Sequence, residues 1–401
     1  MSTLSVPTLK STRVRKALQR LRSTDHLPLS TIPAVQDEDE EDDQNPLQNS
    51  SRWVLGARVA AIRSGAYLGF SIFHYSDPKA PPPTKTIWVD STLSKWTGRQ
   101  VIAVDVFDPI PKSEHKKKIP DGKRLAVINF HGGGFFLGSG TDDRHWVGAL
   151  NNSLDAIVFS VNYRLAPSYP FPTPVEDCAD AVLQICGRAD EFRFDKVILS
   201  GFSAGGTLSL ASWIILHYPQ QWGYELGRPV PPIEGLALFY PGLDWSIPRW
   251  KKRQNCAQPG LALPKSLTDL IDASYIYPPR TIKERRDLRM SPGLMPDELL
   301  DELPPIHLCM CEHDMLRAEG HRFVNRLRDR DKDVTARLVT GERHAWDKPP
   351  PMAQKPSASV EYTVAIAHIK GWLSQEDGVR GSEDSGNEKS DVLASNGMVS
   401  C

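Results

Sequence analysis

One ten-residue run constrains this chain of 401 residues more than any other. Val197–Leu199 is apolar and partly β-branched, as in a buried strand, and Gly201-Phe202-Ser203-Ala204-Gly205 follows after one residue. A helical pattern begins directly after this Gly-x-Ser-x-Gly motif. Such a strand–turn–helix corner strains the backbone at the serine and lifts its Oγ above the sheet, while glycines on either side avoid clashes in the tight turn. The pattern favours Ser203 as an exposed nucleophile over the alternative, an ordinary glycine-rich βα turn.

A second glycine-rich turn lies upstream. The apolar run Leu125–Phe130 predicts a buried strand that ends in His131-Gly132-Gly133-Gly134-Phe135. Glycines allow backbone N–H groups to approach a ligand atom closely. The N–H groups of Gly133, Gly134 and Ala204 are therefore candidates for an oxyanion hole, which needs donors aimed at the oxygen that becomes charged in acyl transfer. The alternative is a phosphate-binding loop, but the chain has neither a Walker-type lysine here nor a Gly-x-Gly-x-x-Gly pattern.

A serine nucleophile needs a base, and the base needs an acid that orients it. The predicted strand Ile306–Cys311 is followed by Glu312-His313-Asp314, so Asp314 lies just past the carboxyl end of a strand, where such sheets carry functional groups. The next predicted strand, Thr335–Val339, is followed by a loop that contains His344. Along the chain, the three candidates thus occur in the order Ser203, Asp314, His344.

Each of these assignments has an alternative. Asp314 is also suited to cap the N-terminus of a helix, and Glu312 is a second candidate for the acid. His313 fits a solvated loop residue better than a catalytic one, and His344 taken alone could be a surface histidine. Two further histidines follow Asp314, but both fall within helical patterns: His321 and His368.

Four stretches together resemble the hormone-sensitive-lipase family of α/β-hydrolases, which includes bacterial esterases and arylacetamide deacetylases. The similarity extends over residues 85–374, and each motif occurs in the family's order and approximate spacing. The resemblance implies a triad of Ser203, Asp314 and His344 and an oxyanion hole of Gly133, Gly134 and Ala204. The stretches are His131–Phe135, Tyr163–Pro167 with Tyr169–Pro172, Gly201–Gly206, and Glu312–Leu316 with His344.

One position departs from the family pattern. The residue before the nucleophile is usually aspartate, and here it is Phe202. The triad is unaffected, but the charge near the serine differs, so substrate preference is expected to differ too. The family also contains gibberellin receptors, which bind a ligand in this pocket and lack a working histidine. The presence of His344 favours an enzyme over such a receptor.

These motifs predict a serine hydrolase that cleaves short- to medium-chain or aryl carboxylic esters through an acyl-enzyme intermediate. The expected partner is a small-molecule ester, and no cofactor or metal is expected because neither C-x-x-C nor H-E-x-x-H occurs. Three alternatives remain: a hydrolase of a natural-product ester or lactone, a non-catalytic ligand-binding protein, and a scaffold that binds partners through charged tails. Oligomeric state is not readable from the sequence.

Regularly alternating strand and helix patterns predict an α/β fold with a largely parallel sheet. We expect an α/β-hydrolase catalytic domain over residues 85–374, preceded by cap helices over 51–84. The charged ends, 1–50 and 375–401, are expected to be disordered. The proline-rich segment 245–305 has two interpretations. It contributes to a lid or an acyl pocket, or it is a surface excursion with short helices. The predicted strands are Val101–Phe107, Leu125–Phe130, Ala156–Val161, Lys196–Ser200, Gly235–Tyr240, Ile306–Cys311 and Thr335–Val339.

The net charge and the composition of individual segments indicate which partners and which cellular compartment to expect. A net charge of −1 gives no electrostatic footprint for nucleic acid. No secretory signal pattern occurs, so the cytoplasm is the expected location, although the basic stretch Lys10–Arg22 resembles a mitochondrial transit peptide in composition. Two arginines, Arg58 and Arg63, interrupt the apolar stretch Trp53–Phe73 and argue against a membrane span. Weak contact between this predicted cap and a membrane surface remains an alternative.

Overall fold

The computed structural model describes residues 45–76, 81–95, 101–119, 124–348 and 355–374. The predictions for the two charged ends lie outside these ranges, apart from residues 45–50. That short segment forms a turn against the rest of the chain, because the Asn45 side chain donates a hydrogen bond to the Asp269 carbonyl at 2.8 Å. Residues 45–50, which the sequence analysis expects to be disordered, thus form a turn that contacts α9.

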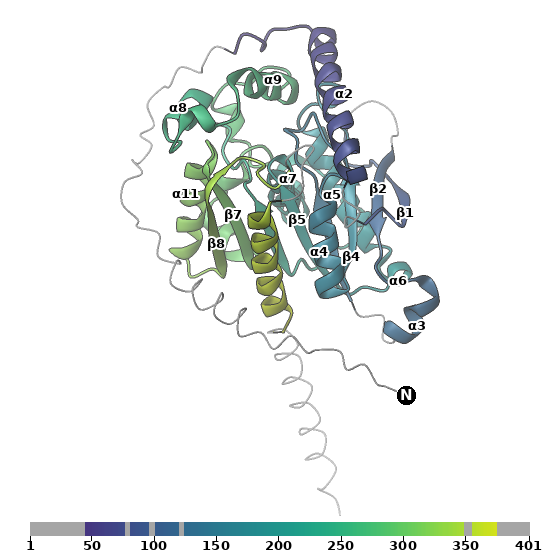
Figure 1. Ribbon diagram of the computed structural model, residues 1–401. Coiled ribbons are helices and arrows are strands. Elements are labelled where there is room, and N and C mark those ends of the chain that lie inside the picture. Colours follow the sequence, from purple (N-terminus) through teal and green to yellow (C-terminus); the bar gives the residue numbers. More distant parts are fainter. Residues whose placement is uncertain (1–44, 77–80, 96–100, 120–123, 349–354, 375–401) are drawn as a thin grey trace, which may run out of the picture. The chain divides into compact units, whose positions relative to one another are not determined.

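An eight-stranded sheet, in the order β1-β2-β4-β3-β5-β6-β7-β8, forms the centre (Figure 1). The pairs from β4 to β8 are parallel, whereas β1–β2 and β2–β4 are antiparallel. The predicted, largely parallel α/β sheet is confirmed; the sequence analysis missed β1. The strands are β1 Lys85–Asp90, β2 Val101–Phe107, β3 Leu125–Phe130, β4 Ile157–Asn162, β5 Lys196–Phe202, β6 Gly235–Phe239, β7 Ile306–His313 and β8 Val334–Arg343.

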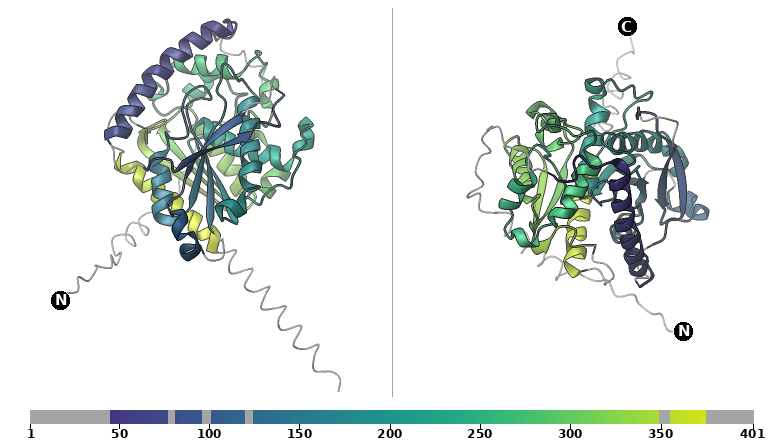
Figure 2. Two further views of the ribbon diagram at one scale, coloured as in Figure 1. Left: turned by 90° about the vertical axis from the view of Figure 1, so that its right-hand side faces the viewer. Right: turned by 90° about the horizontal axis from the view of Figure 1, so that it is seen from above.

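Helices cover both faces of the sheet, because the central strands are apolar on both sides (Figure 2). One face packs against α5, α7 and α11, and the other against α4 and a last helix over 356–374. Along β5, for example, Val197 and Leu199 belong to one core and Ile198 to the other, as the two-residue period of a strand requires. The helices are α2 Arg52–Ser76, α3 His115–Lys118, α4 Arg144–Leu154, α5 Thr173–Cys186, α6 Ala189–Phe192, α7 Ala204–His217, α8 Arg249–Gln254, α9 Lys265–Tyr275, α10 Asp297–Glu302 and α11 Arg317–Arg328.

The order of strands determines where a site can form. From β3 the sheet extends to β4 on one side and to β5 on the other, so the direction of winding reverses at β3. Crevices at the carboxyl ends of strands beside such a switch point are the usual ligand sites of open α/β sheets. The two glycine-rich turns follow β3 and β5, and these strands are direct neighbours, with Phe130 paired to Gly201.

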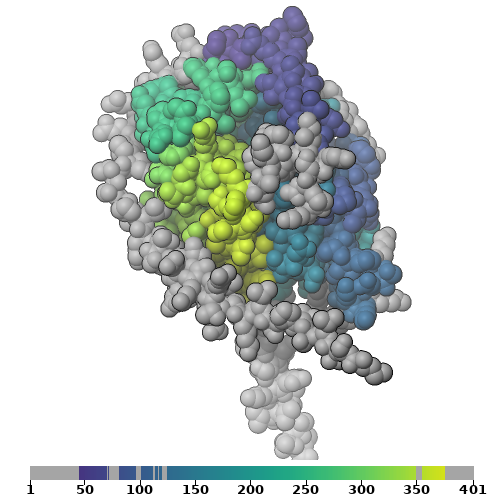
Figure 3. Space-filling view, in the orientation of Figure 1, coloured from purple at the N-terminus to yellow at the C-terminus, as the bar shows by residue number. Residues whose placement is uncertain are grey.

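The predicted N-terminal cap is one 25-residue helix, α2, which packs beside α9 (Figure 3). Its Arg63 guanidinium donates to the Phe136 carbonyl at 2.7 Å and to the Ala166 carbonyl at 2.8 Å, which fixes α2 to the loops that follow β3 and β4. Among the described residues, no helix combines the length and the apolar character that crossing a membrane requires.

Gly205 sets how closely α7 approaches β3, and its substitution is expected to destabilise the protein strongly. A Cβ at this position would lie 1.8 Å from the Phe130 carbonyl oxygen, so the Gly205→Ala change must displace backbone. We expect the free energy of unfolding to fall by about 3 kcal/mol or more in urea titrations. Gly56→Ala, in α2 with open space around its Cβ, is the matched control and should be stabilising by about 0.5–1 kcal/mol. Equal effects of the two changes would contradict this account.

Candidate active site

Ser203 occupies the corner between β5 and α7 in a backbone conformation that side-chain-bearing residues rarely adopt. Its φ is 52° and its ψ is −116°. This strain is stabilised from two sides, because the Ser203 N–H donates to the Phe239 carbonyl at 2.8 Å and α7 begins at the next residue. A Cβ on Gly201 would lie 2.3 Å from Gly205, so the two glycines of the motif are needed for the turn itself.

A continuous chain of hydrogen bonds joins Ser203 to His344 and Asp314. Ser203 Oγ lies 2.8 Å from His344 Nε2, and His344 Nδ1 lies 2.6 Å from Asp314 Oδ2. Both partners are buried, with 6% of the histidine side chain and 2% of the aspartate side chain exposed. The carboxylate can only accept at Nδ1, so the neutral imidazole keeps its proton there and presents the Nε2 lone pair to the serine hydroxyl.

Asp314 is held in place by the start of the following segment. Its Oδ1 accepts from the Leu316 N–H at 3.0 Å, and its carbonyl accepts from Arg317 N–H at the beginning of α11. The carboxylate therefore orients the turn before the helix and the histidine at once, although the N-cap residue of α11 is Leu316. Asp314 therefore contacts His344 as the predicted acid would, whereas its expected position as the N-cap of the helix is taken by Leu316, and Asp314 binds the turn that precedes the helix.

The alternative residues lie elsewhere. Glu312 accepts from the Gly341 N–H at 2.7 Å, across the β7–β8 pair, and makes no hydrogen bond to His344. His321 lies in α11, where burial first, and nearby arginines second, lower its pKa to about 4. His368 lies in the helix over 356–374 and contacts Thr335. Of the candidate bases, only His344 reaches Ser203.

The glycine loop after β3 approaches Ser203 closely. A Cβ on Gly132 would lie 3.6 Å from the Ser203 Cβ, and Gly133 and Gly134 adopt φ of +112° and +59°, which favour glycine. The backbone N–H groups of Gly133, Gly134 and Ala204 donate to no acceptor in the part of the chain that the structure describes. Ala204 is the first residue of α7, where an N–H has no partner within the helix. All three residues predicted to supply oxyanion donors thus line cavities that Ser203 also lines, and their N–H groups are unpaired within the described chain.

Two cavities of different size meet at Ser203 and His344. The larger has a volume of about 340 Å³ and a mainly apolar wall, with α2 contributing Gly65 and α9 contributing Leu267 and Ile271. The smaller, of about 30 Å³, extends past Ala204 to Trp245. Segment 245–305 therefore lines both cavities. This agrees with the interpretation of this segment as part of a lid or acyl pocket rather than as a surface excursion. No cluster of three metal-ligating side chains occurs within the described ranges.

Phe202, at the position where the family has aspartate, belongs to a buried aromatic cluster. Its ring stacks on Phe239 with centroids 4.4 Å apart and meets Trp146 edge to face. The Lys348 ammonium lies 3.6 Å above the same ring and pairs with Asp143 at 3.0 Å and with Asp347. Burial lowers the pKa of Lys348, but Asp143 and Asp347 outweigh this effect, so the pKa is raised and the lysine is charged. The charge of Lys348 is thus balanced by Asp143 and Asp347, and Phe202 contributes the face of its ring instead of a carboxylate.

The sequence analysis did not identify Lys348 or its partners. Asp143 precedes α4, whereas Asp347 and Lys348 follow His344 by three and four residues. Asp347 also accepts from the Tyr240 and Tyr362 hydroxyls, and the Tyr240 ring packs edge to face on His344 at 4.9 Å. In the sequence, the only indication of this pairing was that Asp347 and Lys348, of opposite charge, closely follow His344.

Removing the Lys348 ammonium is expected to cost stability. Lys348→Met leaves two buried carboxylates without their cation, so we expect the free energy of unfolding to fall by about 3–5 kcal/mol. Lys355→Met is the matched control, because its ion pair with Glu342 is half exposed and such pairs contribute less than about 1 kcal/mol. Urea unfolding of both variants at neutral pH measures the difference. A loss no larger for Lys348 than for Lys355 would show that the buried pair is not stabilising.

Comparison with known proteins agrees with this geometry. A family described as alpha/beta hydrolase fold matches residues 127–348, more than half of the chain. An arylesterase of Saccharolobus solfataricus is 30% identical over 271 residues, which cover 67% of this chain and 78% of the relative. The carboxylesterase NlhH of Mycobacterium tuberculosis is 33% identical over 244 residues, which cover 57% of this chain and 68% of the relative.

A solved structure extends the similarity along the chain. A thermostable carboxylesterase cloned from a metagenomic library superimposes with a TM-score of 0.60 at 25% identity, over 81% of this chain and 98% of that one. Its similarity therefore reaches well beyond the segment that carries the motifs. The chain belongs to the α/β-hydrolase family that its motifs resemble, the hormone-sensitive-lipase family of esterases.

Proposed function

We propose that this protein hydrolyses carboxylic esters through an acyl-enzyme intermediate, with Ser203 as nucleophile, His344 as general base and acid, and Asp314 as the group that orients the histidine. The observation that carries the proposal is the hydrogen-bond chain from Ser203 Oγ through both nitrogens of His344 to Asp314, at 2.8 and 2.6 Å. The names of the relatives, an arylesterase and carboxylesterases, support the same reaction. Residues 85–374 form the catalytic domain in this proposal, and α2 forms its cap.

In the proposed mechanism the residues act in the following order. His344 Nε2 accepts the serine proton as Oγ bonds to the ester carbonyl carbon. The carbonyl oxygen becomes an oxyanion, which the N–H groups of Gly133, Gly134 and Ala204 stabilise; one such donor typically contributes about 10²–10³-fold in rate. The protonated His344 then gives its proton to the leaving alcohol as the C–O bond breaks. Water, deprotonated by the same nitrogen, attacks the acyl-serine and releases the acid.

The two cavities suggest which esters fit. The larger arm of the ester needs the apolar cavity of about 340 Å³, which suits an aryl group or a medium-length alkyl chain. The smaller arm has a space of only about 30 Å³, roughly that of two water molecules. We therefore propose aryl and short- to medium-chain esters with one small arm as the substrate class. A hydrolase of a bulky natural-product ester is the second candidate, because the large cavity is apolar and extends under α2.

Labelling with a fluorophosphonate probe tests the proposal directly. We expect the label on Ser203, located by peptide mass spectrometry, together with turnover of p-nitrophenyl acetate that is faster than turnover of the octanoate, because both arms of the octanoate exceed the small cavity. Turnover restricted to bulky lactones would favour the second candidate. A folded protein that takes no label and hydrolyses no ester would contradict the enzyme and favour a ligand-binding member of the family.

A further inference from the structure

Two apolar side chains lie at the junction between the large and the small cavity. The residues that line both cavities are Gly134, Ser203, Leu263, Ile271 and His344. Gly134, Ser203 and His344 take part in the proposed reaction, whereas Leu263 and Ile271 have no role in it. Because residues shared by two cavities lie where the cavities adjoin, these two side chains border the passage from one cavity to the other.

The Ile271 side chain packs directly against the glycine loop after β3. A Cβ on Gly134 would lie 2.7 Å from Ile271 Cγ1 and 2.8 Å from its Cδ1, so this side chain covers the glycine. One turn further along α9, the Tyr275 ring stacks on Phe135 with centroids 3.7 Å apart. Helix α9 is thus attached to the glycine loop at two successive turns, which places Ile271 beside a backbone N–H proposed to hold the ester oxygen.

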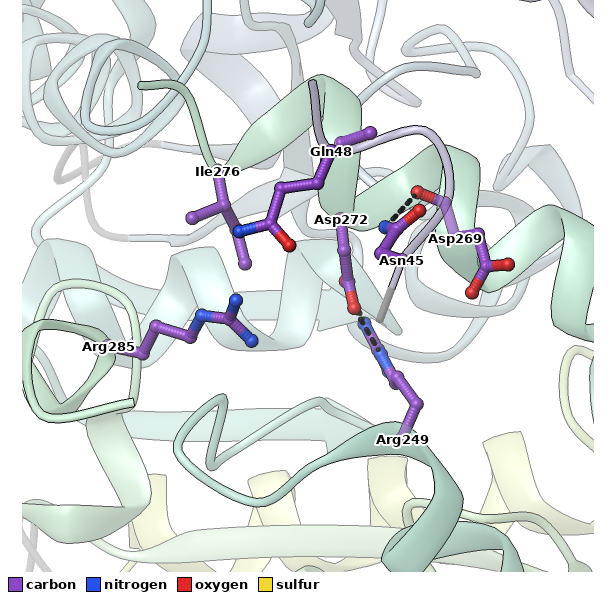
Figure 4. Close-up of a pocket in the computed structure, with 8 residues that line it drawn as sticks. Asn45, Gln48, Arg249, Asp269, Asp272, Ile276 and Arg285 are labelled. Atoms are coloured by element: carbon purple, nitrogen blue, oxygen red, sulfur yellow. Dashed lines mark hydrogen bonds and ion pairs between the residues drawn. The ribbon is translucent and has the colours of Figure 1, made fainter. Parts of the chain in front are cut away.

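Helix α9 is also held by α8. Asp272, which follows Ile271, accepts from Arg249 Nε and Nη2 at 2.9 and 2.6 Å. Figure 4 shows this pair in a polar pocket between α8, α9 and residues 45–48. Such two-pronged pairs fix geometry as well as contributing energy. Because α8 and the glycine loop both hold α9, the Ile271 side chain is a fixed boundary of the two cavities.

The rest of the small cavity has a tightly packed wall. Trp245 is 6% exposed, and its ring packs edge to face on Phe135 with centroids 5.6 Å apart. Met315 and Leu316, which line the same cavity, are buried as well. Close-packed interiors resist the insertion of even one methylene group. A longer substrate group therefore gains room only toward the large cavity, past Ile271.

We propose that Ile271 is a specificity-determining residue, whose side chain separates the small cavity from the large one and so restricts aryl ester substrates to acetyl and propionyl groups. The proposal rests on the esterase function proposed above. In an aryl ester the ring fits only the cavity of about 340 Å³, so the acyl group occupies the small one. A space of about 30 Å³ holds roughly two non-hydrogen atoms beyond the ester carbonyl, as in a propionyl group.

The test compares p-nitrophenyl hexanoate with p-nitrophenyl acetate, which share a leaving group and differ in acyl length. The measured quantity is the ratio of kcat/KM for the hexanoate to kcat/KM for the acetate on one enzyme preparation, so that the fraction of folded enzyme cancels. Ile271→Ala opens the junction between the cavities. We expect the ratio to rise by about 10-fold or more relative to the unmodified chain, because one methylene group in an apolar pocket changes kcat/KM by about 10–200-fold.

Leu267→Ala is the matched control. Leu267 lies one turn earlier in α9 and lines the large cavity but not the small one, so a similar truncation there should leave the ratio unchanged. Ile271→Val, which removes a single methyl group, should raise the ratio by a smaller factor and carries the test if Ile271→Ala does not fold. An unchanged ratio in the folded Ile271 variants, or an equal rise in Leu267→Ala, would overturn the role of Ile271 while leaving the esterase function standing. Absence of turnover of both esters by the unmodified chain would overturn the two proposals together.

Discussion

Replacing Ser203 with alanine is expected to lower kcat for p-nitrophenyl acetate on the order of 10⁶-fold, because the covalent intermediate can no longer form. The fold should be unaffected. Ser203 Oγ bonds only to His344 in the described chain, so the change removes one hydrogen bond and creates no large cavity. Stopped assays at high enzyme concentration measure the residual rate, and circular dichroism during urea unfolding reports the stability.

Ser212→Ala provides the matched control for this change. Ser212 lies in α7, nine residues along the chain from Ser203, and its buried hydroxyl has no partner among the described residues. Its variant should keep both turnover and fluorophosphonate labelling. Substantial turnover in Ser203→Ala, or labelling of that variant at the wild-type rate, would mean that another residue is the nucleophile.

The sequence could indicate that Ser203, Asp314 and His344 lie together because each follows a strand with a short, apolar pattern. The predicted strands Val101–Phe107 and Leu125–Phe130 coincide with β2 and β3 in both boundaries. Parallel strands bring their carboxyl ends to one edge, so locating Ser203, Asp314 and His344 after such strands also places them together. The predicted boundary of the last strand was less accurate: β8 continues through Gly341–Arg343, beyond a bulge opposite Cys311 and His313.

Other parts depend on contacts that no local pattern reveals. β1 was missed because Trp88 is 62% exposed on an edge strand, so its short segment lacks a continuous apolar run. The pairing of Lys348 with Asp143 joins two loops 205 residues apart. Segment 245–305 consists of short helices and turns, so its periodicity could not show that Trp245 and Ile271 border the serine. Local sequence patterns thus predict the positions of the reacting groups, whereas the lining of the cavities that would select a substrate depends on tertiary packing.

The second large expected effect is a loss of kcat that identifies the catalytic acid. One substitution in each candidate, Asp314 and Glu312, distinguishes them. Asp314→Asn is expected to lower kcat by about 10⁴-fold. An amide presents an N–H as readily as an oxygen to His344 Nδ1, which permits the tautomer that carries its proton on Nε2. That tautomer cannot accept the proton of Ser203, and the positive imidazole that forms during attack loses the carboxylate beside it.

Glu312→Gln is the matched control, because it removes the same charge two residues earlier. Within the described residues, Glu312 accepts only from the Gly341 N–H, at 2.7 Å, and a glutamine oxygen can replace that contact. We expect kcat/KM for p-nitrophenyl butyrate to stay within about threefold of the unmodified chain, since this change leaves the proton on Nδ1 of His344. A large loss in Glu312→Gln with little loss in Asp314→Asn would reassign the acid to Glu312. It would also require the loop after β8 to move, because His344 Nδ1 now lies 2.6 Å from Asp314.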